Sequence, residues 1–328
     1  MNRWLHLSGE QVAQVNLPVP EIRAAVEEMF LNKAAGRVEM PPKLGVSLGA
    51  DGFLHAMPCS IPCVPAVGMK WIGALPSNPS RGAPQISGVI LLNDPENGLP
   101  IAVLDAAWIT AKRTAAASVV AVSRLAWQPV HTLAVLGCGN QGRSHVEAFV
   151  SAFPIRKVLA YDVSKPAALS FLEQMEALHG SREDPRITFS LAEQPKEAVG
   201  DADIVVTAGP IAKKPYETIQ AGWLRHGACG VSIDFASAWS SGAIAGLGTV
   251  CVDDLPQFRT YQQIGYFAHV PRVDVALEHL VSGEHGREPT GQGGGFACML
   301  GLASEDLVVA ERVFQRAKTL GIGTWIDR

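Results

Sequence analysis

The sequence predicts an α/β protein with a doubly wound parallel sheet and a second, smaller α+β domain. Apolar strands alternate with helical stretches after residue 131, and this βαβ alternation is typical of a parallel sheet. The expected strands lie at 132–136, 157–161, 203–207, 228–233 and 248–252. Residues 38–104 differ, because they are rich in Pro and Gly and contain only short apolar runs. That region predicts a small sheet with long functional loops.

Three helices complete the expected organisation. Residues 20–34 carry apolar side chains on one face and stop before Gly36, and residues 106–126 contain small side chains that permit close packing. A third helix is expected up to Gly321, with Ser304 as its N-cap and Glu305 and Asp306 in its first turn. We expect this helix to return to the first domain. The predicted domains are therefore 1–120 joined by 300–328, for substrate binding and dimerisation, and 121–299.

Composition excludes several classes of protein. The chain has 328 residues, enough for two domain cores, and its 48% hydrophobic and 18% charged residues are typical of a globular protein. A net charge of −4 offers no basic patch for nucleic acid, and no apolar run is long enough to span a membrane. The first residues lack the apolar core of a signal peptide, and the six cysteines are scattered without zinc-site spacing. We therefore expect buried thiols, no metal site and a cytoplasmic location.

The strand at 132–136 runs into a glycine-rich turn, a helix and a second strand that ends in an acid. The turn is Gly137-Cys138-Gly139-Asn140-Gln141-Gly142, and the acid is Asp162. Gly137 allows the tight turn, Gly139 lets a pyrophosphate approach the backbone, and Gly142 lets the helix pack closely on the sheet. The helix that starts near Asn140 directs its free N–H groups at the phosphates. This order predicts a Rossmann-type dinucleotide-binding domain.

Asp162 indicates which dinucleotide is bound. A carboxylate at this place accepts hydrogen bonds from both ribose hydroxyls, and it would repel the 2′-phosphate of NADP. No Arg follows it directly, since the next residues are Val163 and Ser164. We therefore predict NAD as the cofactor, with NADH preferred over NADPH. The residues expected to bind it are Gly137, Gly139, Asn140, Gln141, Gly142, Asp162, Thr207 and Ala208.

Three basic residues precede the nucleotide-binding domain in Gly- and Pro-rich surroundings: Lys43, Lys70 and Arg113. Lys70 lies in an apolar run, where burial of a Lys is unfavourable unless the side chain is paired or functional. Arg113 lies on a helix of small residues, and a guanidinium can grip a carboxylate with two parallel hydrogen bonds. Such a clamp beside a nicotinamide predicts an amino acid, keto acid or imino acid substrate. The alternative is a Lys that snorkels to the surface and a surface Arg.

Several segments together resemble one known family. They follow the family's order over nearly the whole chain: Gly36–Lys43, His55–Pro58, Gly68–Trp71, Leu91–Pro100, Leu104–Asp105, Arg113–Ala116, the glycine motif and Gly301–Asp306. On these motifs the chain resembles the ornithine cyclodeaminase/μ-crystallin family, and within it the NAD-dependent alanine dehydrogenase and ketimine reductase branch.

The resemblance implies a fold of two domains, in which the first binds substrate and forms a homodimer through its sheet. It implies that Lys70 lies near the carboxylate and reacting nitrogen of the substrate. It also implies that Arg113 binds that carboxylate and that Thr114 approaches the cofactor phosphates.

Two positions depart from the family's pattern. His55 stands where members often have Arg, and an imidazole grips a carboxylate as a cation only when protonated. It is either a substrate contact, together with Lys43 and Met57, or a structural loop residue. Cyclodeaminases carry an acid shortly after the fifth strand, and a gapless alignment places Ala236 there, with Asp234 two residues earlier. Asp234 is either a substitute catalytic acid or a loop or cap carboxylate, so deamination with cyclisation is in doubt.

These observations predict an NAD(H)-dependent oxidoreductase that reduces an imine or ketimine carboxylate to an amino acid, or the equivalent amino-acid dehydrogenase. Arg113, with Lys70 and His55, would hold the α-carboxylate. Lys70 would polarise or protonate the imine nitrogen, so that hydride passes from nicotinamide to C2. Two alternatives stay open: a cyclodeaminase that uses NAD catalytically and releases ammonia, and a non-catalytic protein that binds NAD(P)H or another ligand.

Overall fold

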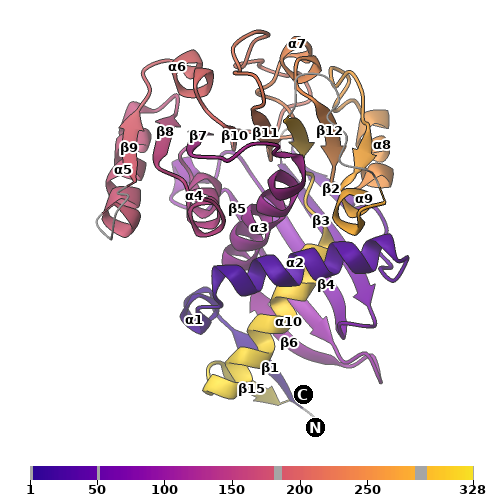
Figure 1. The fold of residues 1–328 in the computed structure, drawn as a ribbon. Helices are drawn as coiled ribbons and strands as arrows, with labels where there is room; N and C mark the ends of the chain where they lie inside the picture. Colours follow the sequence, from indigo (N-terminus) through magenta and orange to yellow (C-terminus); the bar gives the residue numbers. More distant parts are fainter. Residues whose placement is uncertain (1–2, 50–51, 181–186, 285–293, 328) are drawn as a thin grey trace. The chain divides into compact units, whose positions relative to one another are not determined.

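The computed structural model describes residues 3–49, 52–180, 187–284 and 294–327 (Figure 1). The chain divides into two compact units: unit 1 comprises Met1–Arg113 and Leu302–Arg328, and unit 2 comprises Thr114–Gly301. The boundaries expected from the sequence, 120/121 and 299/300, lie a few residues away. The first division falls inside helix α3 (Ala107–Leu125), where a continuous helical pattern gives no sign of it.

Within the described residues, unit 1 contains a sheet of seven strands in the order β15-β1-β6-β5-β4-β3-β2. Each pairing is antiparallel except that of β1 with β6. The region 38–104, where a small sheet was expected, supplies β2 to β6, and β1 and β15 join this sheet from the two ends of the chain. The strands are β1 (Arg3–Leu7), β2 (Leu44–Leu48), β3 (Gly52–Ile61), β4 (Ala66–Ala74), β5 (Ile86–Asn93), β6 (Pro100–Asp105) and β15 (Thr324–Asp327).

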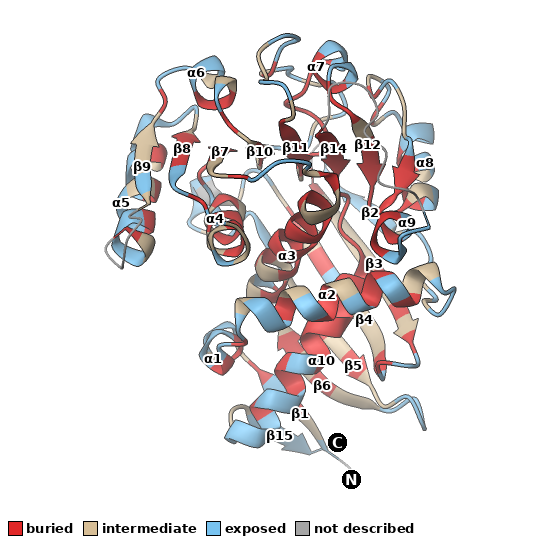
Figure 2. Cartoon of the chain, viewed as in Figure 1, coloured by how far each residue is buried: buried red, intermediate tan, exposed pale blue. Residues whose placement is uncertain are grey.

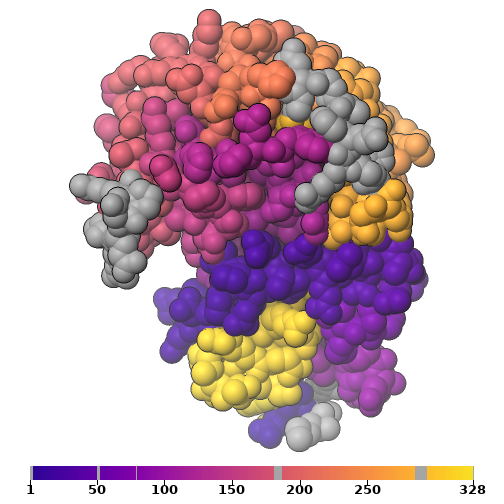
Figure 3. Space-filling model, viewed as in Figure 1, coloured from indigo at the N-terminus to yellow at the C-terminus, as the bar shows by residue number. Residues whose placement is uncertain are grey.

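One helix covers a face of this sheet. Helix α10 (Ala303–Leu320) packs on β3, β4 and β5, and it also contacts α1 (Gly9–Val15) and α2 (Val19–Ala34). Figure 3 shows the C-terminal residues of unit 1 lying directly against its N-terminal helices. Arg312 on α10 pairs with Glu28 on α2 at 3.1 Å. A 3₁₀ turn at Pro79–Arg81 lies between β4 and β5.

The start of α10 differs from the sequence expectation. Leu302, not Ser304, is the N-cap, and Ser304 lies inside the first turn. The Glu305 side chain reaches back to accept a hydrogen bond from the Leu302 N–H at 3.3 Å, so no hydroxyl is needed at the cap. The helix ends before Gly321, whose φ of 69° is the left-handed conformation that favours glycine.

Unit 2 contains the predicted doubly wound parallel sheet, with strand order β13-β12-β14-β11-β10-β7-β8-β9 in the described residues. The five predicted strands are present as β7 (Thr132–Leu136), β8 (Lys157–Tyr161), β10 (Ile204–Thr207), β11 (Cys229–Ser232) and β12 (Thr249–Val252). Pattern reasoning missed three strands of two to four residues, β9 (Thr188–Leu191), β13 (Val275–Ala276) and β14 (Gly295–Cys298). The expected glycine-rich loop at 291–295 lies partly outside the described residues, and Gly295 begins β14.

The strand order creates the crevice in which this kind of sheet binds ligands. From β7 the chain continues to β8 and β9 on one side, and then to β10 and β11 on the other. The order therefore reverses between β7 and β10, at the carboxyl ends of buried strands (Figure 2). The helices of this unit after α3 are α4 (Asn140–Ala152), α5 (Lys165–His179), α6 (Pro195–Gly200), α7 (Ser241–Ala245), α8 (Leu255–Gln263) and α9 (Leu277–Ser282).

Candidate functional site

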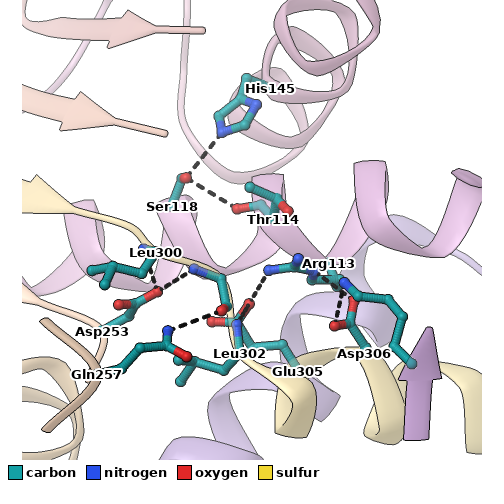
Figure 4. Close-up of polar contacts among 12 residues, drawn as sticks. Arg113, Thr114, Ser118, His145, Asp253, Gln257, Leu300, Leu302, Glu305 and Asp306 are labelled. Atoms are coloured by element: carbon teal, nitrogen blue, oxygen red, sulfur yellow. Dashed lines mark hydrogen bonds and ion pairs between the residues drawn. The ribbon is translucent and has the colours of Figure 1, made fainter. Parts of the chain in front are cut away.

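Unit 1 contains a buried cluster of two cations and two carboxylates (Figure 4). Lys70 lies in the middle of β4 with 1% of its surface exposed, and its Nζ is 2.5 Å from Oδ2 of Asp306. Arg113 on α3 is 5% exposed, and its Nε is 2.8 Å from Oδ1 of Asp306. Its Nη1 is 2.5 Å from Oε2 of Glu305. The structure thus brings the two predicted cations together through one carboxylate. The alternative of a snorkelling Lys and a surface Arg is wrong.

Burial lowers the pKa of Lys70. Loss of solvent, together with the charges of Arg113 and Lys43, lowers the pKa of Lys70 to about 7, although Asp306 opposes the shift. An ammonium with such a pKa gives up and regains a proton near neutral pH. Burial also raises the pKa of Glu305, against the opposing charge of Arg113.

Sequence reasoning assigned Glu305 and Asp306 to the first turn of α10 and gave them no role in the site. One signal was available, because two buried cations require counter-charges nearby. Which carboxylates supply them depends on a contact between residues 192 positions apart in the chain. Only the packing of α10 against β4 and β5 reveals it.

The other residues predicted for substrate lie around Lys70 in unit 1. Met57 on β3 is the register partner of Lys70, so both side chains lie on the face that α10 covers. His55, two residues earlier, is half-buried, and its ring stacks on Phe53 at 4.1 Å. Burial and the charges of Lys43 and Lys70 lower the pKa of His55 to about 4. His55 is therefore neutral near pH 7, where it can donate a hydrogen bond but cannot act as a cation.

The predicted nucleotide-binding turn lies in unit 2, between β7 and α4. Gly137 has a φ of 107°, and a Cβ there would lie 2.6 Å from the Ala208 carbonyl oxygen. A Cβ on Gly142 would lie 2.3 Å from the Gly137 carbonyl oxygen, whereas one on Gly139 would meet nothing within 4 Å. Gly139 caps α4 without a side-chain hydrogen bond, so the N-cap side chain occupies none of the first N–H groups of that helix. These features fit a dinucleotide pyrophosphate.

The acid at the end of β8 lies beside this turn. Oδ2 of Asp162 accepts a hydrogen bond from the Cys138 N–H at 2.8 Å, and Oδ1 accepts one from the Ser164 N–H at 2.9 Å. The side chain of Val163, between Asp162 and Ser164 in the sequence, is 94% exposed. The carboxylate is thus held at the glycine turn, where the fingerprint expects a ribose.

A buried polar contact connects α3 to the first turn of α4. Oγ of Ser118 lies 2.9 Å from Nε2 of His145, and Nδ1 of His145 lies 2.7 Å from the Gln141 carbonyl oxygen. Ser118 also lies 3.0 Å from the carbonyl oxygen of Thr114, the residue predicted to approach the phosphates. Sequence reasoning missed Ser118 and His145, because a single Ser and a single His on separate helices form no motif.

Comparisons with known proteins identify the family to which this chain belongs. Residues 7–320 match the model of the ornithine cyclodeaminase/mu-crystallin family. The chain belongs to this family. It is 32% identical over 327 residues to the nodulation efficiency protein NfeD of Rhizobium meliloti, covering 99% of this chain and 98% of that protein. It is also 32% identical over 334 residues to an alanine dehydrogenase of Archaeoglobus fulgidus, covering 98% of each.

A solved member of the ornithine cyclodeaminase/mu-crystallin family has the same fold over the whole chain. The Δ¹-pyrroline-2-carboxylate reductase of Thermococcus litoralis, in complex with NADH and L-proline, matches with a TM-score of 0.85 at 27% identity. The match covers 98% of this chain and 99% of that one.

Asp234, which was considered as a substitute catalytic acid, is fully buried, and its carboxylate is directed into the interior of unit 2. Oδ1 accepts hydrogen bonds from Ser232 Oγ at 2.6 Å and Thr207 Oγ1 at 3.0 Å, and Oδ2 accepts one from the Tyr216 hydroxyl at 3.1 Å. Burial raises the pKa of Asp234 to about 6, although these hydrogen bonds oppose the shift. The geometry matches the alternative of a loop carboxylate.

Thr207 belongs to the same interior network. Its hydroxyl donates to Asp234 and accepts a hydrogen bond from Trp239 Nε1 at 2.9 Å. The role of Thr207 in cofactor binding stays a prediction. Ala208, which follows it, lies against Gly137 in the glycine turn.

The described parts of the chain contain neither a candidate membrane span nor a candidate metal-binding cluster. No helix there is both long and apolar enough to cross a bilayer. No group of three or more His, Cys, Asp or Glu side chains there could hold a metal ion.

Proposed function

We propose that this protein is an NAD(H)-dependent oxidoreductase that reduces an imine carboxylate to an amino acid. The buried arrangement of Lys70, Asp306 and Arg113 carries the proposal, because it places a proton donor that titrates near neutral pH beside a carboxylate-binding guanidinium. An imine with an α-carboxylate needs both groups. The glycine turn of unit 2 supports the cofactor, because its backbone leaves room for a dinucleotide pyrophosphate.

The reaction assigns a separate task to each cation. Arg113 binds the α-carboxylate and thereby orients C2. Lys70 donates a proton to the imine nitrogen, which makes C2 more electrophilic and leaves a neutral lysine. A reduced nicotinamide held through the glycine turn from Gly137 to Gly142 would supply the hydride. The C=N double bond thus gains one hydride and one proton and becomes the amine.

Asp162 supports NAD in preference to NADP as the cofactor. Its carboxylate is fixed by two backbone N–H groups at the glycine turn, so it cannot easily move away from a 2′-phosphate. A fixed negative charge there favours two ribose hydroxyls over a phosphate dianion.

The substrate class follows from the family relationship. The relatives include an alanine dehydrogenase and a Δ¹-pyrroline-2-carboxylate reductase. We infer that the substrate is either a cyclic ketimine carboxylate or the open-chain imine of a keto acid and ammonia. In both, the α-carboxylate and the imine nitrogen have the same spacing, and the side chain alone differs.

The decisive experiment follows NADH absorbance with purified protein and a panel of pyrroline-2-carboxylate, piperideine-2-carboxylate and small keto acids with ammonia. We expect stoichiometric loss of NADH with at least one of them. Lys112→Met removes a neighbouring cation on the same helix as Arg113 and is the matched control, since it should retain the activity. No loss of NADH across the panel would refute the reductase. Release of ammonia from ornithine or lysine without net NADH turnover would then establish a cyclodeaminase.

We also propose a homodimer formed through the sheet of unit 1. Leu44, Ala56, Trp71 and Val89 are register partners across β2, β3, β4 and β5, on the face opposite Lys70. All four are exposed or half-buried in the single chain, and Leu44 is 66% exposed. A continuous apolar face of this kind is self-complementary, so a second copy covers it without any other partner.

Light scattering tests the dimer. Trp71→Glu places a charge on the apolar face and should produce monomers. Leu169→Glu changes an exposed apolar residue of unit 2 and should leave the mass unchanged. A wild-type protein with the mass of a single chain would rule the dimer out.

A reducing compartment fits the cysteines. All six have free thiols, five of them buried, whereas Cys63 is exposed and corrects the expectation that all are buried. We therefore propose a cytoplasmic location, which fractionation of the producing cells would test.

A further inference from the structure

We propose that Asp306 is a positioning residue that couples the binding of a carboxylate at Arg113 to the protonation of Lys70. The proposal rests on the function given above and adds a residue to it. Asp306 is fully buried, and each of its two oxygens lies against a different cation, Oδ2 against Lys70 and Oδ1 against Arg113. It is therefore the shared counter-ion of the proton donor and the carboxylate-binding group.

The charged groups around Lys70 come from three segments of unit 1, and strand β3 adds titratable groups that are neutral near pH 7. Helix α10 contributes Asp306 and the adjacent Glu305, and α3 contributes Arg113. Strand β3 contributes two neutral groups near pH 7, His55 and Cys59, whose thiol has its pKa raised to about 12 by burial. The segment before β2 contributes Lys43, and the register partner on β5 is the apolar Ile90.

This balance makes the proton on Lys70 sensitive to what Arg113 binds. Asp306 attracts the ammonium, whereas Arg113 and Lys43 repel it. A carboxylate bound at Arg113 cancels part of that repulsion, so Lys70 holds its proton more tightly when the carboxylate is present. The coupling is reciprocal, and the carboxylate therefore binds more tightly below the titration midpoint of Lys70 than above it. Binding of the substrate carboxylate thus stabilises the proton on Lys70 that the imine nitrogen requires.

Nuclear magnetic resonance of the full-length protein with ¹³Cε-labelled lysine measures the coupling without catalysis. The Lys70 signal is identified by its absence in Lys70→Met, and its titration is followed with and without sodium acetate at constant ionic strength. We expect acetate to raise the midpoint by about half a pH unit or more, with the other lysines unchanged. An unchanged Lys70 midpoint would overturn the proposal.

Variants of the two carboxylates test the role of Asp306 itself. Asp306→Asn should lower the Lys70 midpoint by roughly 1–3 pH units, because an opposite charge in direct contact is lost. Asp306→Glu keeps the carboxylate and should restore most of the shift, and Glu305→Gln, which leaves the contact with Lys70 intact, should change it less. Circular dichroism reports whether each variant folds. A folded Asp306→Asn protein with the wild-type midpoint would contradict the role of Asp306.

The acetate titration of the wild-type protein needs no variant, so it decides the coupling even if Asp306→Asn does not fold. The readouts also separate this proposal from the proposed function. If acetate shifts Lys70 but no imine consumes NADH, the coupling holds and the reductase fails. If NADH is consumed but acetate leaves Lys70 unchanged, the reductase holds and the coupling fails.

Discussion

Oγ of Ser118 on α3 lies 2.9 Å from Nε2 of His145 on α4, in the interior of unit 2. Nδ1 of the same ring lies 2.7 Å from the Gln141 carbonyl oxygen, which can only accept a hydrogen bond. The neutral imidazole therefore carries its proton on Nδ1, and Nε2 and the Thr114 carbonyl oxygen are both acceptors for the single hydroxyl proton of Ser118. This contact fixes the first turn of α4, the turn that holds Asn140 and Gln141 of the nucleotide cradle.

The fold should lose stability in acid through His145. Burial lowers the pKa of His145 to about 4, below its value in the unfolded chain. The unfolded state therefore binds more protons between pH 6.5 and 4, and the free energy of unfolding falls as the pH drops through that window. His145→Phe should reduce the pH dependence of the free energy of unfolding by an amount that corresponds to at most one bound proton. Urea unfolding at several pH values measures this dependence. His226→Gln, an exposed His of the same unit, should keep it, and an unchanged slope in His145→Phe would refute the assignment.

Two glycines of the nucleotide turn should respond differently to the same substitution. Gly137→Ala places a side chain in left-handed backbone against the Ala208 carbonyl, so it should reduce the free energy of unfolding by about 1–3 kcal/mol. Gly139→Ala meets open space and should leave unfolding within roughly 0.5 kcal/mol of the wild type. It should nevertheless weaken NADH binding about tenfold or more, because its Cβ occupies the approach of the pyrophosphate. Fluorescence titration with NADH and thermal unfolding check both. Normal affinity in Gly139→Ala would place the pyrophosphate elsewhere.

How far the sequence predicted the structure depended on whether the signal was local. The turn from Gly137 to Gly142 and the strands on either side were predicted correctly, because each is encoded within a few consecutive residues. Strand β14 was missed because its four residues follow a glycine-rich stretch and carry no alternation. The orientation of Thr207 was also beyond prediction, since its hydroxyl turns inward to Asp234 and Trp239, which lie 27 and 32 residues later.

In the candidate site, too, residues with a local sequence signal were predicted, and residues brought close only by folding were not. Lys70 and Arg113 were recognisable because a cation in an apolar segment is exceptional. Their counter-ions were not, because Glu305 and Asp306 are close to Lys70 and Arg113 only after α10 has packed on the sheet of unit 1. His55 was predicted as a possible cationic contact, but burial, together with the neighbouring charges of Lys43 and Lys70, lowers its pKa to about 4.

Asp162 should determine the choice between NADH and NADPH. Asp162→Ser removes the charge that opposes a 2′-phosphate, so the ratio of the NADPH and NADH dissociation constants should fall at least tenfold. Part of the change should come from weaker NADH binding, since the carboxylate also holds the Cys138 N–H. Asp201→Asn neutralises an exposed acid of the same unit and is the control for a general charge effect. Equal loss of affinity for both nucleotides would remove Asp162 from the specificity determinants.

Replacement of Arg113 should lower kcat/KM for the imine and change the affinity for NADH very little. Arg113→Ala removes the group that binds the α-carboxylate, so kcat/KM for the imine should fall by a factor of roughly 100 or more, equivalent to about 3 kcal/mol. The affinity for NADH should stay within about twofold, because the nucleotide cradle belongs to unit 2. The substitution also leaves Glu305 without the cation that it pairs with and Asp306 with Lys70 alone, so the variant should unfold more readily by about 3–5 kcal/mol. Kinetics must therefore be measured well below its unfolding temperature, with Lys112→Met as the control. An equal loss of NADH affinity in Arg113→Ala would show that the guanidinium does not act on the carboxylate alone.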